Sequence, residues 1–140
     1  MARPSSPGRV DWYARRGQPF AKSIRLDGVN LTGATARSQV RPYADAATLH
    51  FDLVTGTYPI ATTAAARTAI SVDLTGPLPV SFIFLWIPQA PIDALEPFAS
   101  NGTEPGQALR KAWDCIVTPD SEVPSTWFFG DFFIVPGVTK

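Results

Sequence analysis

The feature that most constrains this chain is a series of short segments in which apolar and polar residues alternate. Successive side chains of a β-strand point to opposite faces, so a period of two predicts strands buried on one face. Five segments show the pattern: VDWYAR (10–15), FAKSIRL (20–26), ATARSQVRP (34–42), TLHFDLV (48–54) and AISVDL (69–74). Lys22 alone breaks the phase of its segment, and turn residues such as Asp27-Gly28 separate the segments. The series predicts an all-β domain.

Three other segments predict one further strand, one short helix and one loop. The run LPVSFIFLWIP (78–88) is about half as long as a membrane helix, which needs about 20 residues, so it predicts a buried strand. PIDALEPF (91–98) predicts a short helix, because Pro91 suits its first turn and Pro97 stops it. ATTAAARTA (61–69) predicts a loop or a single turn.

Length and composition predict one globular domain behind a short arm. The chain has 140 residues, 45% of them apolar, which suits a single core. Residues 1–8 are rich in proline, serine and glycine without periodicity and predict a flexible arm, so the domain is expected to span 9–140. The first residues lack the apolar stretch of a secretory signal, and Cys115, the single cysteine, allows no internal disulfide. Both features favour assembly in a reducing cytoplasm.

The last 30 residues predict a hairpin whose second strand is apolar on both faces. In KAWDCIVT (111–118), one face carries Trp113, Cys115 and Val117. In TWFFGDFFIV (126–135), the two faces are expected to carry Trp127, Phe129, Asp131, Phe133 and Val135, against Phe128, Gly130, Phe132 and Ile134. Such a strand is central and covered on both sides, or another chain covers it. Gly130 in mid-strand indicates a bulge or a close backbone approach.

Residues that could serve as nucleophile or relay are few. His50, the single histidine, lies on the polar phase of a predicted strand and is expected at the surface. Cys115 shares its phase with Trp113 and is expected to be a small core residue. The chain has no Gly-rich phosphate loop and no metal-ligand spacing, so we expect no cofactor, no metal and no enzyme activity.

Carboxylates are the remaining acid–base candidates. Asp114, Asp120, Glu122 and Asp131 cluster in sequence around the last hairpin, and a glycosidase would need two of them at a set separation. We expect the first three at turns and strand edges. Asp131 lies among aromatic residues, so it is expected to hydrogen-bond the backbone at a bulge or to pair with an arginine across an interface.

The net charge is zero, but the charges are unevenly distributed along the chain. Residues 1–41 carry eight Lys/Arg and two Asp, a net +6, and the remaining residues carry four Lys/Arg and ten Asp/Glu, a net −6. Such a chain can dock head-to-tail on copies of itself, unless the fold interleaves the two parts and cancels the asymmetry. An isoelectric point near 6.5 disfavours nucleic acid as a partner.

The order of several motifs resembles a known phage family. A Gly-bearing turn joins two strands in RRGQPFAKSIRL, and a DG turn and LTGAT segment lead into a strand ending in arginine in DGVNLTGATARSQVRP. The chain closes with an aromatic-Asp strand, a turn, a Gly-containing strand and a terminal Val-Thr in AWDCIVTPDSEVPSTWFFGDFFIVPGVTK. Over residues 9–140 this series resembles the N-terminal immunoglobulin-like domain of phage upper baseplate proteins. The segment 75–109 is longer and more apolar than the family pattern, which favours an added strand or docking element.

The resemblance implies an immunoglobulin-like β-sandwich of seven to nine strands with one short helix. It also implies a structural virion protein, an adaptor that joins tail, baseplate or fibre components and is assembled in the cytoplasm of the bacterial host. The implied partners are other virion proteins and copies of the chain itself, with no nucleic acid and no membrane. A capsid decoration or head-fibre base protein is the alternative within the same class.

The surface expected to meet partners is aromatic, with arginines of the N-terminal arm beside it. The candidate interface residues are Arg3, Arg9, Trp12, Phe82, Phe84, Trp86, Trp127, Phe129 and Phe133. A carbohydrate-binding sandwich is the rival from another class, with Trp12, Tyr13 or Trp127 stacking on sugar rings. A small hydrolase is the third hypothesis, and it would use carboxylates such as Asp114 and Asp131.

Overall fold

The computed structural model describes residues 7–94 and 109–135, which form nine strands and one short helix. The strands are β1 (Gly8–Arg9), β2 (Trp12–Arg15), β3 (Phe20–Asp27), β4 (Thr35–Arg41), β5 (Phe51–Thr55), β6 (Arg67–Asp73), β7 (Val80–Ile87), β8 (Leu109–Thr118) and β9 (Ser125–Val135). The helix α1 spans Gln89–Asp93. No helix within these ranges has the length and apolarity that a bilayer crossing demands.

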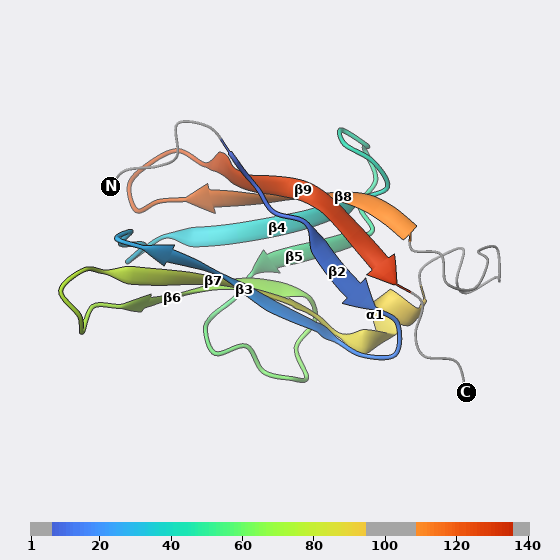
Figure 1. The fold of residues 1–140 in the computed structure, drawn as a ribbon, viewed down its shortest axis with the longest axis horizontal. Coiled ribbons are helices and arrows are strands. Elements are labelled where there is room, and N and C mark those ends of the chain that lie inside the picture. Colours follow the sequence, from blue (N-terminus) through green and yellow to red (C-terminus); the bar gives the residue numbers. More distant parts are fainter. Residues whose placement is uncertain (1–6, 95–108, 136–140) are drawn as a thin grey trace.

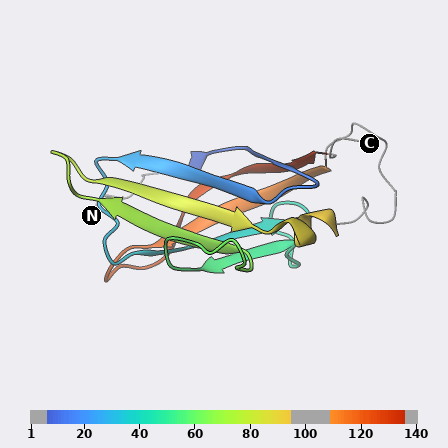
Figure 2. The ribbon, with the colours of Figure 1, turned by 90° about the horizontal axis from the view of Figure 1, so that it is seen from below.

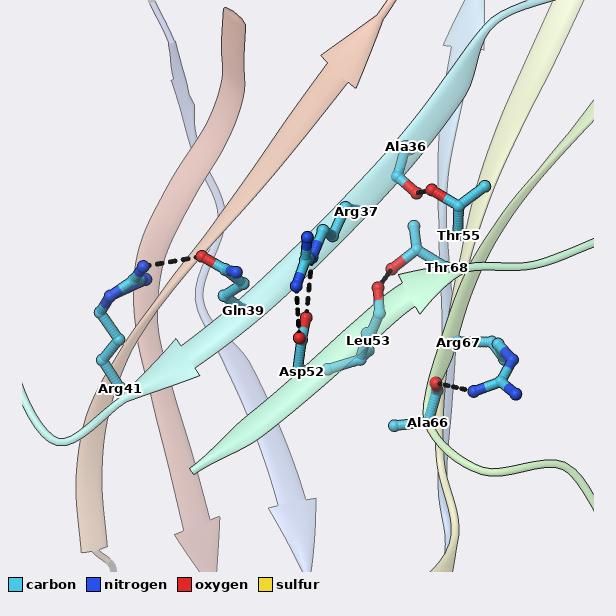
Figure 3. Close-up of polar contacts among 10 residues, drawn as sticks. All are labelled: Ala36, Arg37, Gln39, Arg41, Asp52, Leu53, Thr55, Ala66, Arg67 and Thr68. Atoms are coloured by element: carbon cyan, nitrogen blue, oxygen red, sulfur yellow. Dashed lines mark hydrogen bonds and ion pairs between the residues drawn. The ribbon is translucent and has the colours of Figure 1, made fainter. Parts of the chain in front are cut away.

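The strands form two layers joined along one side (Figures 1 and 2). The first layer, sheet I, has the order β9-β8-β4-β5, with β1 and β2 both parallel to the outer side of β9. The second layer, sheet II, has the order β6-β7-β3. A short parallel pairing between β5 and β6 joins the layers, and there the buried Thr68 hydroxyl donates to the Leu53 carbonyl at 2.9 Å (Figure 3). The opposite side, between β2 and β3, stays open.

This order matches an immunoglobulin-type sandwich strand for strand. In that fold, strands B, E and D form one sheet, and strands C, F and G form the other, which C′ extends. Here β3, β7 and β6 take the first set of positions, β4, β8 and β9 the second, and β5 the place of C′. The predicted fold class, an all-β immunoglobulin-like sandwich of seven to nine strands with one short helix, is confirmed.

The core lies between the layers and is filled by the inward-facing side chains that alternation predicts. On β4, Ala36, Ser38 and Val40 are buried between exposed or half-buried neighbours. The completely buried apolar residues come from both layers and from α1: Leu53, Ile83, Ile87, Ile92, Cys115, Val117 and Ile134. Lys22 has the inward phase but lies on the edge strand β3 and is exposed, as suits a charge that protects a sheet edge.

Several boundaries differ from the sequence prediction. The helix begins at Gln89, two residues before Pro91, because proline is tolerated within a first helical turn. The predicted end at Pro97 lies outside the described residues, as do residues 1–6 of the predicted arm. Gly8 is already part of a strand rather than of the predicted arm. Residues 61–66 form a loop with a turn, as predicted, but Arg67, Thr68 and Ala69, the end of the predicted loop, belong to β6.

A β-bulge in β9 turns the Trp127 side chain toward the core. Cys115 pairs with Phe128 and Ile116 with Thr126, so Trp127 is the extra residue of β9 at this point. Both Trp127 and Phe128 are therefore buried, at 2% and 9% exposure, although they are consecutive. The prediction that Trp127 shares a face with Phe129 and Phe133 is wrong, because the bulge shifts the phase between them.

Gly130 lies where the backbones of β9 and the β1–β2 connection come closest. A Cβ atom at this position would overlap the Val10 carbonyl oxygen. The same segment is held by two hydrogen bonds: the Val10 amide donates to the Phe129 carbonyl at 2.9 Å, and the Trp113 indole donates to the Val10 carbonyl at 2.6 Å. The predicted close approach is confirmed, and the bulge lies three residues before it.

Candidate functional site

The outer face of sheet I is covered by arginine–aspartate pairs. Arg37 holds Asp52 from the neighbouring strand, with one nitrogen–oxygen distance of 2.9 Å (Figure 3). This hydrogen bond lowers the pKa of Asp52 below its ordinary value. Arg41 lies 3.7 Å from Asp114, whose pKa is raised by burial. These pairs link β5, β4 and β8 across the face.

The pairs cancel the charge asymmetry of the sequence in space. Asp131 on β9 accepts from Arg9 at 2.9 Å and contacts Arg110 at 3.2 Å. Together with the pairs of Arg37 and Arg41, this joins arginines of the first 41 residues to aspartates of the later chain. On sheet I, the fold therefore interleaves the two parts of the chain, and their opposite charges do not form a head-to-tail dipole.

Asp131 is a structural residue that fixes the N-terminal strand. Besides its two arginines, its backbone amide donates to the Asp11 carboxylate at 2.9 Å. The Arg9 guanidinium also lies over the Phe129 ring, 5.8 Å from its centroid. The predicted pairing of Asp131 with arginine occurs within this chain rather than across an interface. Because its carboxylate is already paired, Asp131 is a poor candidate for acid–base chemistry.

The outer face of sheet II is different, because it carries a column of aromatic side chains. Phe82, Phe84 and Trp86 point outward from the central strand β7 and are half-buried. Four of their neighbours across the sheet are small, namely Ala21 and Ser23 on β3 and Ala69 and Ser71 on β6. The other two are arginines: Arg25 lies beside Phe82 and Arg67 beside Trp86. The outward face of a two-layer sandwich is usually polar, so this column is a candidate contact surface.

A loop between β5 and β6 turns this aromatic column into a groove. The Tyr58 ring stacks on Phe84, with centroids 4.6 Å apart and an angle of 26° between the planes. The Trp86 indole donates to the Ala64 carbonyl at 2.9 Å, which fixes the loop beside β6. Between the loop and β3 lies a groove of about 390 Å³, lined mainly by Ala21, Lys22, Ser23, Tyr58, Pro59, Ile60, Thr62 and Trp86.

Sequence reasoning identified the floor of this groove but not its wall. Phe82, Phe84 and Trp86 were predicted from the apolar run of β7, which is a local pattern. Tyr58 was not predicted, because a loop residue has no periodicity that reveals what it packs against. An aromatic residue beside a proline, in TYPI (57–60), is the signal that could have drawn attention to it.

The other predicted interface residues are dispersed. Arg3 lies outside the described residues, and Arg9 and Phe129 are exposed on the sheet I side of the molecule. Phe133 is half-buried beneath Tyr13, whose ring is parallel to it at 4.9 Å. The structure thus separates this group from the aromatic column, which lies on the opposite face of the sandwich.

Two predicted surface tryptophans belong wholly or partly to the core. Trp127 is 2% exposed, so its assignment to the interface, and to sugar stacking, is wrong. Trp12 is half-buried and packs edge-on against Phe20 at 5.7 Å and against Trp113 at 5.8 Å.

The single histidine and the single cysteine lie in the interior or at its border. His50 precedes β5 and is half-buried, and its Nε2 atom has no hydrogen-bond partner among the described residues. The prediction of a surface histidine on a strand is therefore wrong. Cys115 is completely buried, and burial raises the pKa of its thiol to about 11, so it is an unreactive core residue as predicted.

Replacing His50 is expected to make the free energy of unfolding less dependent on pH below about pH 6.5. Burial, and secondarily the charge of Lys111, lower the pKa of His50 below its ordinary 6.5. Below about pH 6.5 the unfolded chain therefore binds more protons, and the free energy of unfolding decreases as the pH falls. Urea unfolding at pH 5, 6, 7 and 8 should show a steeper decrease for wild type than for His50→Gln. Parallel profiles would contradict this assignment.

The described residues contain no group of three or more His, Cys, Asp or Glu side chains arranged to hold a metal ion. In comparisons with known proteins, no family model and no curated protein matches the chain. Among solved structures, the crystal structure of the CupB6 tip adhesin from Pseudomonas aeruginosa is similar with a TM-score of 0.34 and 12% sequence identity. The alignment covers 96% of this chain and 42% of the adhesin, so the chain spans less than half of that protein.

Proposed function

We propose that this domain is a structural protein of a tailed-bacteriophage virion, an adaptor that joins tail, baseplate or fibre components through protein–protein contacts. The observation that carries the proposal is the aromatic column Phe82–Phe84–Trp86 on the outward face of sheet II. An apolar outer face rimmed by polar residues marks a surface that another protein covers. The motif order and the immunoglobulin-like strand order support the same class.

A contact role also agrees with how the conspicuous ionisable groups are used. Asp131 and Asp52 are held by arginines, and the Cys115 thiol is completely buried. The aromatic groove, by contrast, is bordered by residues whose hydroxyls can hydrogen-bond a partner, Ser23, Tyr58 and Thr62. This division favours binding over catalysis.

Protein is a better occupant of the groove than carbohydrate. Sugar sites combine a stacking aromatic residue with polar groups that hydrogen-bond several ring hydroxyls. The groove supplies the aromatic wall, but no carboxylate or side-chain amide is among its lining residues. Capsid decoration or a head-fibre base remains the alternative within the virion class, because a contact surface alone does not distinguish these positions.

The proposal predicts that the chain is a component of phage particles. Particles induced from the strain that carries this gene and purified on a density gradient should contain the chain at a fixed ratio to the major structural proteins. Quantitative mass spectrometry measures that ratio, and antibody labelling in electron micrographs distinguishes tail from capsid. A chain present in the lysate but absent from purified particles would refute the proposal.

A further inference from the structure

Sheet II lacks one strand of the immunoglobulin order, and the gap lies beside β3. That order places strand A next to strand B, whose position β3 takes here. The strands that precede β3 in the chain, β1 and β2, pair instead with β9 of sheet I. Within residues 7–94 and 109–135, β3 therefore has β7 on one side and no strand on the other.

The free edge of β3 presents backbone groups arranged to pair with another strand. The Gly28 amide donates to the Pro79 carbonyl at 2.7 Å, which continues the register in which Asp27 pairs with Val80. Because successive residues of a strand direct their amide and carbonyl to opposite sides, the even-numbered residues of β3 bond to β7. The odd-numbered residues direct these groups to the free edge, where no described residue bonds to them: Ala21, Ser23, Arg25 and Asp27.

The open side of the sandwich also leaves apolar side chains partly uncovered. Ile24 and Leu26 of β3 have the inward phase, opposite Ile83 and Ser81 of β7, but both are only half-buried. Trp12 on β2 is likewise half-buried, and all three apolar side chains pack against the core. A strand paired with β3 would direct alternate side chains into this opening and would bury them further.

Lys22 determines which strand this edge accepts. Its side chain has the inward phase, opposite Leu85, and it has no ion-pair partner among the described residues. Beside it, β2 and β3 border a hollow of about 190 Å³ whose lining includes Arg15, Gln18 and Phe20 but no carboxylate. An apolar residue opposite Lys22 would leave a desolvated and unpaired ammonium, whereas a carboxylate would form an ion pair with it.

We infer that the β3 edge binds an extended segment of a partner protein, which adds to sheet II as a fourth strand antiparallel to β3. The segment carries apolar side chains opposite Leu26 and Ile24 and a carboxylate opposite Lys22. Its sequence therefore follows the pattern apolar-x-apolar-x-acidic. Backbone pairing supplies affinity, and the alternate side chains supply specificity. Lys22 thus disfavours indiscriminate pairing of the edge and admits an acidic strand.

The β3 strand of a second copy does not fit this pattern. Its one acidic residue, Asp27, has the outward phase, and paired strands place residues of the same face opposite each other. Asp27 would therefore never lie opposite Lys22. The segment is consequently assigned to another virion protein. The inference rests on the proposed function for this class of partner, and it adds the kind of contact that the partner makes.

Amide hydrogen exchange of the purified chain, measured residue by residue by NMR, tests the free edge. Without a ligand, the amides of the odd-numbered residues in 21–27 should exchange fast, and those of the even-numbered residues slowly, because β7 protects them. The probe is the peptide acetyl-TVTVTETT-amide, which follows the inferred pattern. At saturation it should slow exchange of the odd-numbered amides at least about tenfold. The control peptide acetyl-TVTVTKTT-amide, with lysine in place of glutamate, should give little protection.

Substitutions on β3 separate backbone pairing from charge selection. Ser23→Pro removes one amide from the free edge, where proline is tolerated, so it should weaken binding of the probe at least about tenfold. Ser23→Ala is the matched control, since it keeps the amide, and it should bind like wild type. Lys22→Glu should bind the lysine peptide at least about tenfold more tightly than the glutamate peptide. Fluorescence anisotropy of the labelled peptides measures each affinity.

Three results would each overturn the inference: edge amides that the probe leaves unprotected, a Ser23→Pro variant that binds like wild type, or a Lys22→Glu variant with unchanged preference. Any of these in a chain that is found in phage particles would leave the proposed function standing. A chain that binds the probe but is absent from particles would refute only the proposed function.

Discussion

Trp127→Ala is expected to lower the free energy of unfolding by about 3–5 kcal/mol, the range for removing a large buried aromatic side chain. Trp127 is 2% exposed and faces the core because the β-bulge adds it to β9. Its removal leaves a cavity between two packed layers that cannot collapse, since the adjacent Phe128 already occupies its own position in the core. Urea or thermal unfolding measures the loss.

Phe129→Ala is the matched control for this substitution. Phe129 is two residues along the same strand and aromatic, but it is 39% exposed. Its loss should cost less than about 1 kcal/mol, since surface substitutions away from packed features usually have small effects. Equal losses for the two variants would mean that no bulge separates their faces and that the phase expected from simple alternation holds.

The contrast between these two residues shows which features of this fold the sequence can predict and which it cannot. Alternation is a local signal, so it predicted the buried phase of β4 and of Trp113, Cys115 and Val117 on β8. A bulge depends on which residue of one strand pairs with which residue of another. Nothing local to TWFFGDFFIV distinguishes Trp127 from Phe129, and the pairing with β8 decides between them.

The candidate site was predicted in part for the same reason. The aromatic column of β7 comes from a single apolar run (78–88), so the sequence alone predicted Phe82, Phe84 and Trp86 as core or interface residues. The groove also needs Tyr58, which lies 26 positions before Phe84 in a loop, and small residues on two other strands. These contacts are long-range, and so is the pair of Asp131 with Arg9, which are 122 positions apart. Only the fold brings them together.

Gly130→Ala is expected to lower the free energy of unfolding by about 3 kcal/mol, the upper part of the range for overpacking. The added methyl would overlap the Val10 carbonyl oxygen, so the β1–β2 segment must move away from β9. That carbonyl accepts from the Trp113 indole, and the Val10 amide donates to Phe129, so both bonds are strained together. The Val10 amide should lose hydrogen-exchange protection first. Gly76→Ala, where the nearest atom is 3.8 Å away, should change stability by less than about 1 kcal/mol, and equal losses would contradict the close approach.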